Sequence, residues 1–319
     1  MRKILVTGAL GQIGSELLPA LVERHGIDVV VASDVRVGPS GGSDGDTVFE
    51  VIDCTQRQQI QDVVQRHDIG TIYHLAAMLS AVAEERPQAA WELNMGGVYH
   101  VLEVARQNKC AVFLPSSIGA FGPSTPRDNT PQDTIQRPTT IYGVTKVASE
   151  LLADYYFTRF GVDARGVRFP GLIPHVAPPG GGTTDYAVDI FYQAVRYRHY
   201  TCFLEPDCRL DMMYMPDAVR AMIELMEADP ERLVHRNCFN IAAMNVTPEE
   251  LAAEMRKHVP DFVIDYEVDP VRQAIAESWP RSIDDSAARD EWDWAPAHDL
   301  ASMTKDMLDK LGQRLKPAR

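Results

Sequence analysis

The sequence contains few cysteines and no long apolar run. Its five cysteines form no Cys-x-x-Cys pair and its nine histidines form no His-Glu-x-x-His motif, so neither a zinc module nor a catalytic metal is expected. Unclustered cysteines fit a reducing compartment. The apolar residues Ile4–Val6 are too few for the core of a signal peptide, and no run reaches the length of a membrane span. We therefore expect a cytoplasmic protein without a membrane partner.

Basic residues are also scarce. The chain has 31 lysines and arginines against 45 aspartates and glutamates, a formal net charge of −14. Sequence-independent nucleic-acid binding needs a basic surface that displaces counterions, so no nucleic-acid partner is expected. Acidity maintains solubility and does not identify a ligand. The hydrophobic fraction of 45% and the length of 319 residues predict a globular protein with a substantial core, organised as two joined domains.

Apolar runs alternate with segments of helical periodicity from residue 3 to residue 169. The runs predict buried strands over residues 3–7, 28–34, 47–52, 70–75, 110–114 and 163–169. The periodic segments predict helices over residues 12–25, 57–66, 87–107 and 142–160. Continuous apolar runs are typical of strands that are covered on both faces of a parallel sheet. The alternation therefore predicts an α/β protein with a Rossmann-type, doubly wound parallel sheet.

Proline and glycine are concentrated in residues 170–182, which predicts that the chain leaves the sheet there. Later segments predict helices over residues 185–195, 217–226 and 248–258, and short strands over 236–241 and 261–266. We expect the sheet domain to comprise residues 1–170 and 210–245. A smaller C-terminal lobe that binds the substrate would then comprise residues 171–209 and 246–319.

Three glycines lie between the first predicted strand and the first predicted helix, in the pattern Gly8-x-x-Gly11-x-x-Gly14. In a dinucleotide site the first glycine makes the turn, the second admits the pyrophosphate and the third permits close helix packing. The pyrophosphate would bind the free amides of the helix N-terminus. Glycines in a turn can also be purely structural, but the strand before and the helix after favour a dinucleotide site.

Asp34 lies at the end of the second predicted strand, twenty positions beyond Gly14. A carboxylate there accepts hydrogen bonds from the ribose hydroxyls of an adenosine and repels a 2′-phosphate, which favours NAD over NADP. Arg36 is close enough to soften this repulsion, and the alternative is an ordinary aspartate at a strand end. We expect NAD as the cofactor.

A tyrosine and a lysine occur as Tyr142-x-x-x-Lys146, downstream of Ser116 and Ser117 at the end of a predicted strand. The spacing places both side chains on one helix face, where the ammonium favours the phenolate and supplies a general base near neutral pH. The structural alternatives are that the tyrosine and the lysine belong to a solvated helix face and that the serine caps a helix or a turn. Catalytic groups gather at the carboxyl ends of parallel strands, so a serine there favours a catalytic role for this set. We predict that Tyr142, Lys146 and Ser117 are catalytic, and we prefer Ser117 over Ser116.

Together with His74-Leu-Ala-Ala77 and Asn94-Met-Gly-Gly97, these motifs resemble the extended short-chain dehydrogenase/reductase family over nearly the whole chain. The resemblance implies that the serine, tyrosine and lysine carry catalysis and that the lysine also holds the nicotinamide ribose. The candidate cofactor-binding residues are Gly8, Gly11, Gln12, Ile13, Gly14, Asp34, Asp53, Leu75, Ala76, Ala77, Asn94, Tyr142 and Lys146.

Residues 115–123, 136–138, 179–186 and 278–284 resemble the L-threonine 3-dehydrogenase branch of this family. The resemblance implies NAD-dependent, metal-independent oxidation of L-threonine at its 3-hydroxyl to L-2-amino-3-oxobutyrate, with the tyrosine as general base. It also implies substrate contacts from Ser80, Ser117, Tyr142, Thr183, Thr184 and Trp279.

The main alternative is a nucleotide-sugar 4-epimerase or a related sugar-nucleotide enzyme on the same scaffold. Family members of that kind carry an asparagine after the sixth strand and an arginine near the diphosphate, where this chain has Pro170 and Leu210. Arg209 is one position away and could substitute for that arginine. A non-catalytic NAD(H)-sensing regulator is less expected, because such proteins tend to lose the tyrosine or the lysine.

Some side-chain roles stay open. Hydroxyls and free amides of residues 180–184 could hold a small carboxylate at the start of a helix, or the segment could be a flexible capped loop. Trp279 could be a core or a lid aromatic, and His74 is expected to be a satisfied histidine near the cofactor. The resemblance also implies a homodimer formed through residues 87–107 and 142–160. Their apolar side chains could equally belong to the monomer core: Trp91, Val98, Leu102, Leu151 and Leu152.

Overall fold

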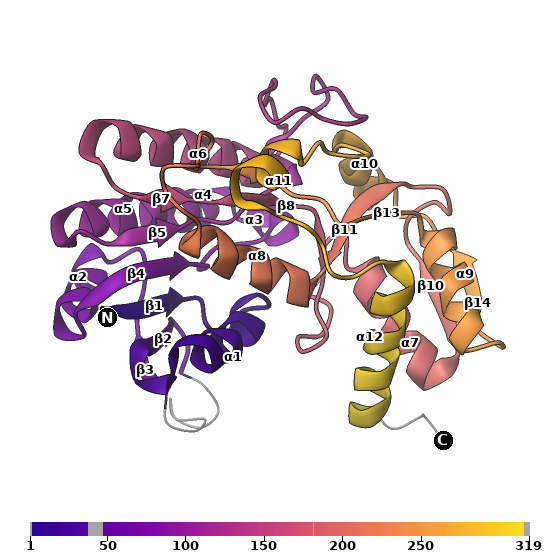
Figure 1. The fold of residues 1–319 in the computed structure, drawn as a ribbon. Coiled ribbons are helices and arrows are strands. Elements are labelled where there is room, and N and C mark those ends of the chain that lie inside the picture. The colour runs from indigo at the N-terminus through magenta and orange to yellow at the C-terminus, as the bar shows by residue number, and fades with distance from the viewer. Residues whose placement is uncertain (1, 38–46, 181, 316–319) are drawn as a thin grey trace. The chain divides into compact units, whose positions relative to one another are not determined.

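The computed structural model describes residues 2–37, 47–180 and 182–315 and divides the chain into two compact units (Figure 1). Unit 1 comprises Met1–Ala120, Pro138–Arg168 and Val219–Phe239. Unit 2 comprises Phe121–Arg137, Phe169–Ala218 and Asn240–Arg319. Compared with the boundaries expected from the sequence, unit 2 additionally takes residues 121–137, 169–170, 210–218 and 240–245.

Unit 1 is built on a six-stranded parallel sheet with the strand order β3-β2-β1-β4-β5-β7. The strands are β1 (Lys3–Thr7), β2 (Val30–Asp34), β3 (Val48–Val51), β4 (Ile69–His74), β5 (Ala111–Phe113) and β7 (Ala164–Arg165). The order reverses between β1 and β4, so the carboxyl ends of these two strands border the crevice where doubly wound folds bind ligands. The Rossmann-type fold expected from the sequence is confirmed.

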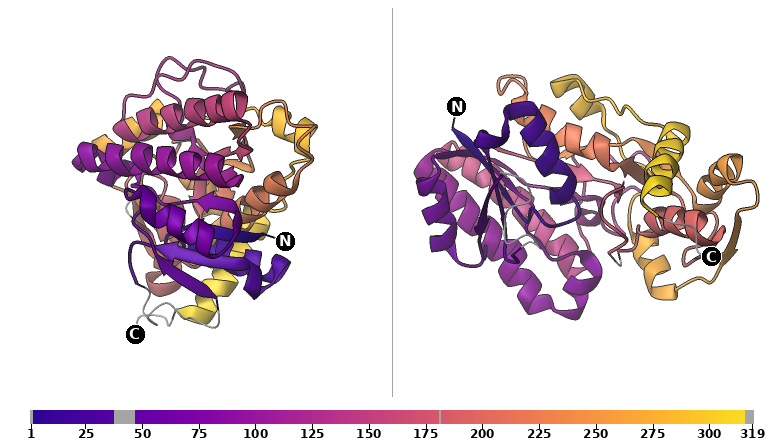
Figure 2. Two further views of the ribbon diagram at one scale, coloured as in Figure 1. Left: turned by 90° about the vertical axis from the view of Figure 1, so that its left-hand side faces the viewer. Right: turned by 90° about the horizontal axis from the view of Figure 1, so that it is seen from below.

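Helices cover both faces of this sheet (Figures 1 and 2). On one face α2 (Arg57–Arg66), α5 (Gly97–Asn108) and α6 (Ile141–Phe160) lie side by side. On the other lies α1 (Gly14–His25), whose Arg24 binds Glu227 of α8 (Met215–Glu227). The core between α2, α5, α6 and the sheet consists of fully buried aliphatic side chains such as Leu5, Ile72 and Val101.

Helix α6 has clear start and stop signals. The Thr140 hydroxyl caps its N-terminus by accepting a hydrogen bond from the Gly143 amide, 3.1 Å away. The helix ends at Gly161, which takes a left-handed conformation with φ 69°. These two signals place residue 142 in the first turn, beside the strand ends.

Three of the expected elements of unit 1 differ in detail. The helix expected over residues 87–107 is α4 (Pro87–Trp91), a π-helical turn η2 (Glu92–Gly96) and α5. Strand β3 is at the sheet edge, so its expected burial is wrong and Val48 and Val51 are exposed. The strand expected over residues 163–169 is interrupted at Gly166, where a Cβ would lie 2.3 Å from the Leu114 carbonyl oxygen. The strand continues as β8 (Val167–Phe169), which pairs in the order β12-β8-β6 with β12 (Phe239–Asn240) and β6 (Ser116–Ser117).

Unit 2 contains two small sheets. In the first, β11 (Leu210–Tyr214) pairs with β9 (Gly171–Ile173) in parallel and with β13 (Met244–Val246) in antiparallel orientation. The expectation that residues 210–245 return to the large sheet is therefore wrong for β11. In the second, β10 (His199–Cys202) pairs in parallel with β14 (Val263–Tyr266).

Five helices complete unit 2: α7 (Tyr186–Tyr197), α9 (Pro248–His258), α10 (Pro270–Ser278), α11 (Ser286–Trp292) and α12 (Leu300–Arg314). Helix α7 packs against α9, α12 and β10. Helix α9 starts at a capping box in which Thr247 and Glu250 bind each other's amides. Across the described ranges, no helix combines the length and the apolarity that a membrane span requires.

Candidate active site

A cavity of about 470 Å³ lies at the carboxyl ends of β1, β2 and β4 in unit 1. Since the strands are parallel, these ends meet at one edge of the sheet, and the expected glycines, acidic residues and Leu-Ala-Ala segment converge there. The cavity is lined by Gly8, Gly11, Asp34, Val35, Arg36, Ile52, Asp53, Cys54, Thr55, Leu75, Ala76, Ala77, Met78, Ala89, Glu92 and Leu93.

The glycine turn between β1 and α1 is too tight for other residues. Gly8 has φ 70°, and a Cβ there would lie 2.8 Å from the Ala76 amide nitrogen. A Cβ at Gly14 would lie 2.5 Å from the Gly8 carbonyl oxygen. The residue before the helix, Ile13, provides no side-chain cap, and the amides of residues 12–14 have no partner among the described residues, so they are left for an anion. The amides of Ser15 and Glu16 already donate to backbone carbonyls. The turn, with Gln12 beside Ile13, therefore fits a dinucleotide pyrophosphate.

Two aspartates occupy the same cavity. Asp34 ends β2, and its carboxylate accepts hydrogen bonds from the Leu10 amide at 3.2 Å and from Arg36 Nε at 3.1 Å. The hydrogen bond and charge of Asp34 raise the pKa of the Arg36 guanidinium. Asp53 accepts from the amide and hydroxyl of Thr55 at 2.9 and 2.7 Å. The Arg36 contact agrees with the expectation that this cation softens the negative charge at Asp34.

The candidate catalytic residues Ser117 and Tyr142 lie against Gly119, and Lys146 lies near the Tyr142 ring. A Cβ at Gly119 would lie 3.2 Å from the Tyr142 ring and 3.5 Å from Ser117 Oγ, which accepts a hydrogen bond from the Gly119 amide at 3.1 Å. Lys146 Nζ lies 5.4 Å from the centroid of the Tyr142 ring and donates to the Pro115 carbonyl at 2.7 Å. The structure thus brings the serine hydroxyl, the phenol and the ammonium into one cluster.

Two glycines that the sequence analysis did not single out make this convergence possible. In the first turn of α6, a Cβ at Gly143 would lie 2.3 Å from the Gly119 carbonyl oxygen and 2.5 Å from the Pro138 Cβ. The helix can approach the loop after β6 only because both positions lack a side chain. In the sequence, the glycine beside Tyr142 is the only indication of this close approach. Its contact partner, Gly119, is distant in the chain and could not be identified from the sequence.

The two serines of β6 point to different partners, as successive residues of a strand do. The Ser116 hydroxyl donates to the Glu150 carboxylate, which forms a buried ion pair with Arg168 at 2.9 Å. Ser117 instead faces the tyrosine cluster. Ser116 is therefore part of a buried structural network, in agreement with the preference for Ser117.

His74 and Asn94 are buried beside Lys146. The Asn94 side chain lies in the π-helical turn, accepts from the Met78 amide at 2.8 Å and donates to its carbonyl at 3.1 Å. The amide of Asn94 thus holds the chain just after the Leu-Ala-Ala segment. His74 Nδ1 lies 2.8 Å from the Thr7 hydroxyl, but Nε2 has no partner among the described side chains and backbone, so the expected satisfied histidine is satisfied at only one nitrogen.

The remaining substrate candidates are divided between the units. Ser80 starts α3 (Ser80–Glu85) in unit 1, whereas Thr183, Thr184 and Trp279 belong to unit 2. The Asp185 carboxylate accepts from the amides of Gly180 and Gly182 at 2.6 and 2.9 Å. These two amides are therefore not free for a substrate carboxylate, which corrects part of the expectation for this loop.

Trp279 is buried, with 7% of its surface exposed, directly after α10. The residues that follow it are held by the loop over residues 127–130. The Arg281 amide donates to the Arg127 carbonyl at 2.7 Å, and Ile283 forms a bridge with Thr130. The tryptophan is therefore part of a well-anchored segment of unit 2.

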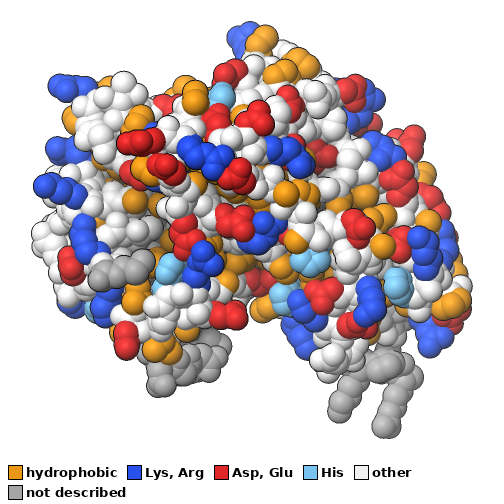
Figure 3. Space-filling view, in the orientation of Figure 1, with side chains coloured by type: hydrophobic (Ala, Val, Ile, Leu, Met, Phe, Trp, Pro, Cys, Tyr) orange, Lys and Arg blue, Asp and Glu red, His pale blue; other side chains and the backbone are white. Residues whose placement is uncertain are grey.

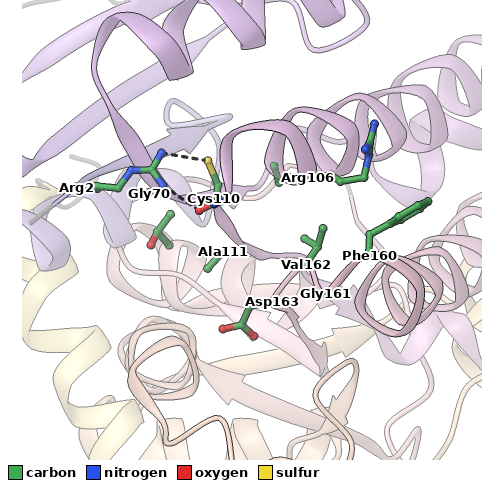
Figure 4. Close-up of a pocket in the computed structure, with 12 residues that line it drawn as sticks. Arg2, Gly70, Arg106, Cys110, Ala111, Phe160, Gly161, Val162 and Asp163 are labelled. Carbon is green, nitrogen blue, oxygen red and sulfur yellow. Dashed lines mark hydrogen bonds between the residues drawn. The ribbon is translucent and has the colours of Figure 1, made fainter.

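A second cavity of unit 1, of about 540 Å³, lies at the amino ends of β4, β5 and β7 (Figure 4). Figure 4 shows the Arg2 guanidinium turned toward Cys110. This cation binds the carbonyls of Asn108 and Lys109 at 3.0 and 2.9 Å, and Arg106 pairs with Glu103. This cavity is larger, but it holds none of the candidate catalytic residues, so the cavity at the carboxyl ends is the better candidate site.

Within residues 2–37, 47–180 and 182–315, no group of three or more His, Cys, Asp or Glu is arranged to hold a metal ion. All five cysteines are free and buried, and burial raises the pKa of the Cys54 thiol to about 12. On the face shown in Figure 3, acidic and basic side chains are intermingled.

Known proteins resemble this chain over nearly its whole length. A model of the NAD-dependent epimerase/dehydratase family matches residues 4–242. An uncharacterized epimerase/dehydratase of Staphylococcus saprophyticus is 54% identical over 311 residues, which are 98% of this chain and 97% of that protein. The structure of L-threonine dehydrogenase from Clostridium difficile is 53% identical with a TM-score of 0.96, and the match covers 98% of each chain.

Two further structures have the same fold. The holo form of a GalE-like L-threonine dehydrogenase from Cupriavidus necator is 53% identical with a TM-score of 0.94, covering 97% of this chain and 99% of that one. An apo structure from a metagenome, described as a monomeric L-threonine 3-dehydrogenase, is 42% identical with a TM-score of 0.94, covering 98% and 100%.

Proposed function

Since the chain belongs to the NAD-dependent epimerase/dehydratase family, we propose that it oxidises the 3-hydroxyl of L-threonine to L-2-amino-3-oxobutyrate. The arrangement of Ser117 and Tyr142 around Gly119, with Lys146 near the Tyr142 ring, carries the proposal, because it assembles a hydroxyl, a phenol and an ammonium at a strand end. The similarity to structures of L-threonine dehydrogenases supports threonine as the substrate.

The cofactor is NAD, and the residues of the unit 1 cavity fit it. Gly8, Gly11 and Gly14 would hold the pyrophosphate at the start of α1, and Asp34 would accept the adenosine ribose hydroxyls. Asp53, Leu75, Ala76 and Ala77 line the same cavity, and Asn94 and Lys146 lie beyond the Leu-Ala-Ala segment. When bound, NAD supplies the acceptor for the hydride that leaves threonine carbon 3.

The side chains of this chain have distinct roles in the proposed reaction. Tyr142, as phenolate, takes the proton of the threonine hydroxyl, while Ser117 donates a hydrogen bond to the same oxygen and holds it in line. The ammonium of Lys146 stabilises the phenolate electrostatically. Further substrate contacts are proposed for Ser80, Thr183, Thr184 and Trp279.

The proposal is tested by following NADH absorbance with L-threonine, other hydroxylated amino acids and UDP-sugars. We expect activity with L-threonine, and we expect Tyr142→Phe to lower kcat about 10²–10⁴-fold because the general base is lost. NAD affinity, measured by calorimetry, should be largely retained. Tyr197→Phe, at an exposed tyrosine of α7, is the control and should keep wild-type rates.

Equal rates in the Tyr142→Phe variant and the wild type would remove this tyrosine from the mechanism. Interconversion of UDP-sugars without threonine oxidation would favour the 4-epimerase alternative. The surroundings of Arg209 oppose that alternative: its guanidinium pairs with Glu250 and donates to the Asn245 carbonyl at 3.0 Å. This arginine is therefore already engaged and does not replace the diphosphate cation missing at Leu210.

We also propose that two copies of the chain pair through α5 and α6 and that the enzyme works in the cytoplasm. The structure separates the apolar residues of these helices. Val98 and Leu102 are buried and Leu152 packs against the core, whereas Trp91 and Leu151 are 48% and 62% exposed. Exposed apolar side chains on neighbouring helices support a protein partner. Buried, unpaired cysteines agree with a reducing location.

A further inference from the structure

The unpartnered nitrogen of His74 lies in a buried place. The imidazole ends β4 with 3% of the residue exposed. A buried polar atom without a hydrogen bond costs about 1–3 kcal/mol, so its surroundings should offer a partner. Nδ1 is engaged by the Thr7 hydroxyl, and only Nε2 lacks a partner among the described residues.

His74 lines a cavity of about 20 Å³ in unit 1, together with the candidate catalytic lysine. A cavity holds a water when it offers about 10–15 Å³ or more and two to four polar partners. The volume meets the first condition, and the polar side chains of the lining, among them His74 and Lys146, meet the second. It comprises His74, Ala76, Ala77, Asn94, Val98, Leu114, Pro115, Lys146 and Ser149.

Electrostatics assign the direction of the hydrogen bonds in this cavity. Burial and the charge of Lys146 lower the pKa of His74 to about 3, so the ring is neutral at working pH. The neutral ring carries its hydrogen on one nitrogen only. The nearby ammonium favours the tautomer with the lone pair on Nε2, because an N–H on that nitrogen would be repelled by the positive charge. Lys146, only 9% exposed, has three N–H groups, and one of them binds the Pro115 carbonyl at 2.7 Å.

We propose that one ordered water bridges His74 Nε2 and Lys146 Nζ, which makes His74 a positioning residue for this lysine. The water accepts an N–H of the ammonium and donates a hydrogen to the ring. It gives the buried cation a second acceptor and holds it near the Tyr142 ring, 5.4 Å from Nζ. The catalytic consequence rests on the proposed function, whereas the water itself does not.

A crystal structure of the full chain, with and without NAD, tests the water directly. We expect a density peak within hydrogen-bonding distance of both nitrogens, and the absence of a peak there would overturn the proposal. The peak should disappear in His74→Phe and remain in His74→Gln, whose amide oxygen can accept from the water.

Kinetics test the positioning role. In His74→Phe we expect kcat for threonine to fall on the order of tenfold, as for the loss of one hydrogen bond to a charged group, with KM and the thermal midpoint little changed. His74→Gln should restore most of kcat. His100→Phe is the control, since this nearby histidine binds the Cys54 carbonyl and does not line the cavity.

Equal kcat losses in the Gln and Phe variants, or a parallel loss of thermal stability, would overturn the positioning role. A wild-type protein that holds the water but does not oxidise threonine would refute the proposed function and leave the bridge in place.

Discussion

At the scale of single residues, the geometry of the candidate site depends on two glycines, which have no side chain. Gly119 lies against the Tyr142 ring and Ser117 Oγ, and Gly143 lies against the Gly119 carbonyl. Alanine is normally better than glycine inside a helix by about 1 kcal/mol. At Gly143 the steric conflict with backbone should outweigh that gain, because a 2.3 Å contact cannot be relieved without moving the helix.

We therefore predict that Gly143→Ala lowers kcat on the order of a hundredfold, because the first turn of α6 and its tyrosine are displaced. The thermal midpoint should also fall. Gly312→Ala in α12 is the matched control, since a Cβ there meets nothing within 4 Å, and it should leave activity unchanged and raise stability slightly. Wild-type kcat in Gly143→Ala would show that the close approach does not position Tyr142.

At the scale of elements, α6 serves two surfaces at once. Its inner face carries Lys146 and the buried Tyr156, whereas Val144, Leu151 and Tyr155 are 41%, 62% and 53% exposed. Their spacing of seven and four residues places them on one helix face. The neighbouring helices add the exposed Trp91 and Tyr99, so the apolar surface extends across α4, α5 and α6.

We predict that Leu151→Glu converts a dimer into a monomer, because the charge would have to be buried against the apolar face of a second copy. Sedimentation velocity of both proteins measures this. Val271→Glu, at a 67% exposed valine of α10 in unit 2, is the control and should not change the assembly. A wild-type protein that sediments as a monomer, like the relative described as monomeric, would contradict the proposed dimer.

At the scale of the whole molecule, stability should depend on a buried acid of unit 2. Asp211 on β11 accepts hydrogen bonds from Asn245 Nδ2 and from the Ile283 amide, both at 2.7 Å. Asp211 thereby joins β13 and the segment after Trp279 to β11, the central strand of its three-stranded sheet. Burial raises the pKa of this carboxyl to about 6, against 3.8 for the unperturbed group.

Because the folded protein keeps this proton to higher pH than the unfolded chain, the contribution of Asp211 to the free energy of unfolding falls as pH rises between these two pKa values. From about pH 4 to pH 7 the stability of the wild type should decline by about 3 kcal/mol relative to Asp211→Asn, which does not titrate. Thermal or denaturant unfolding of both proteins across this range measures the difference. A pH-independent difference would contradict the prediction.

Much of unit 1 could be predicted from local sequence. Buried parallel strands are continuous apolar runs, so β1, β2 and β4 were found within a few residues of their ends, and the glycine turn followed from its position between a strand and a helix. The π-helical turn around Asn94 and the edge position of β3 were not visible, because both depend on neighbouring elements. Residues 210–214 have the same apolar character as the large-sheet strands, and pairing alone assigned them to a separate sheet.

The sequence by itself determined the Rossmann architecture, the nucleotide turn and the candidate catalytic residues, because spacing along a strand or a helix is a local property. Only the tertiary structure decided that Ser116 binds Glu150 while Ser117 faces the tyrosine, and that Leu151 is exposed while Leu152 is covered. It also decided that His74 lines a cavity together with the lysine and that one nitrogen of this ring has no partner among the described residues. These outcomes depend on distances between segments far apart in the chain, which packing sets and residue order does not reveal.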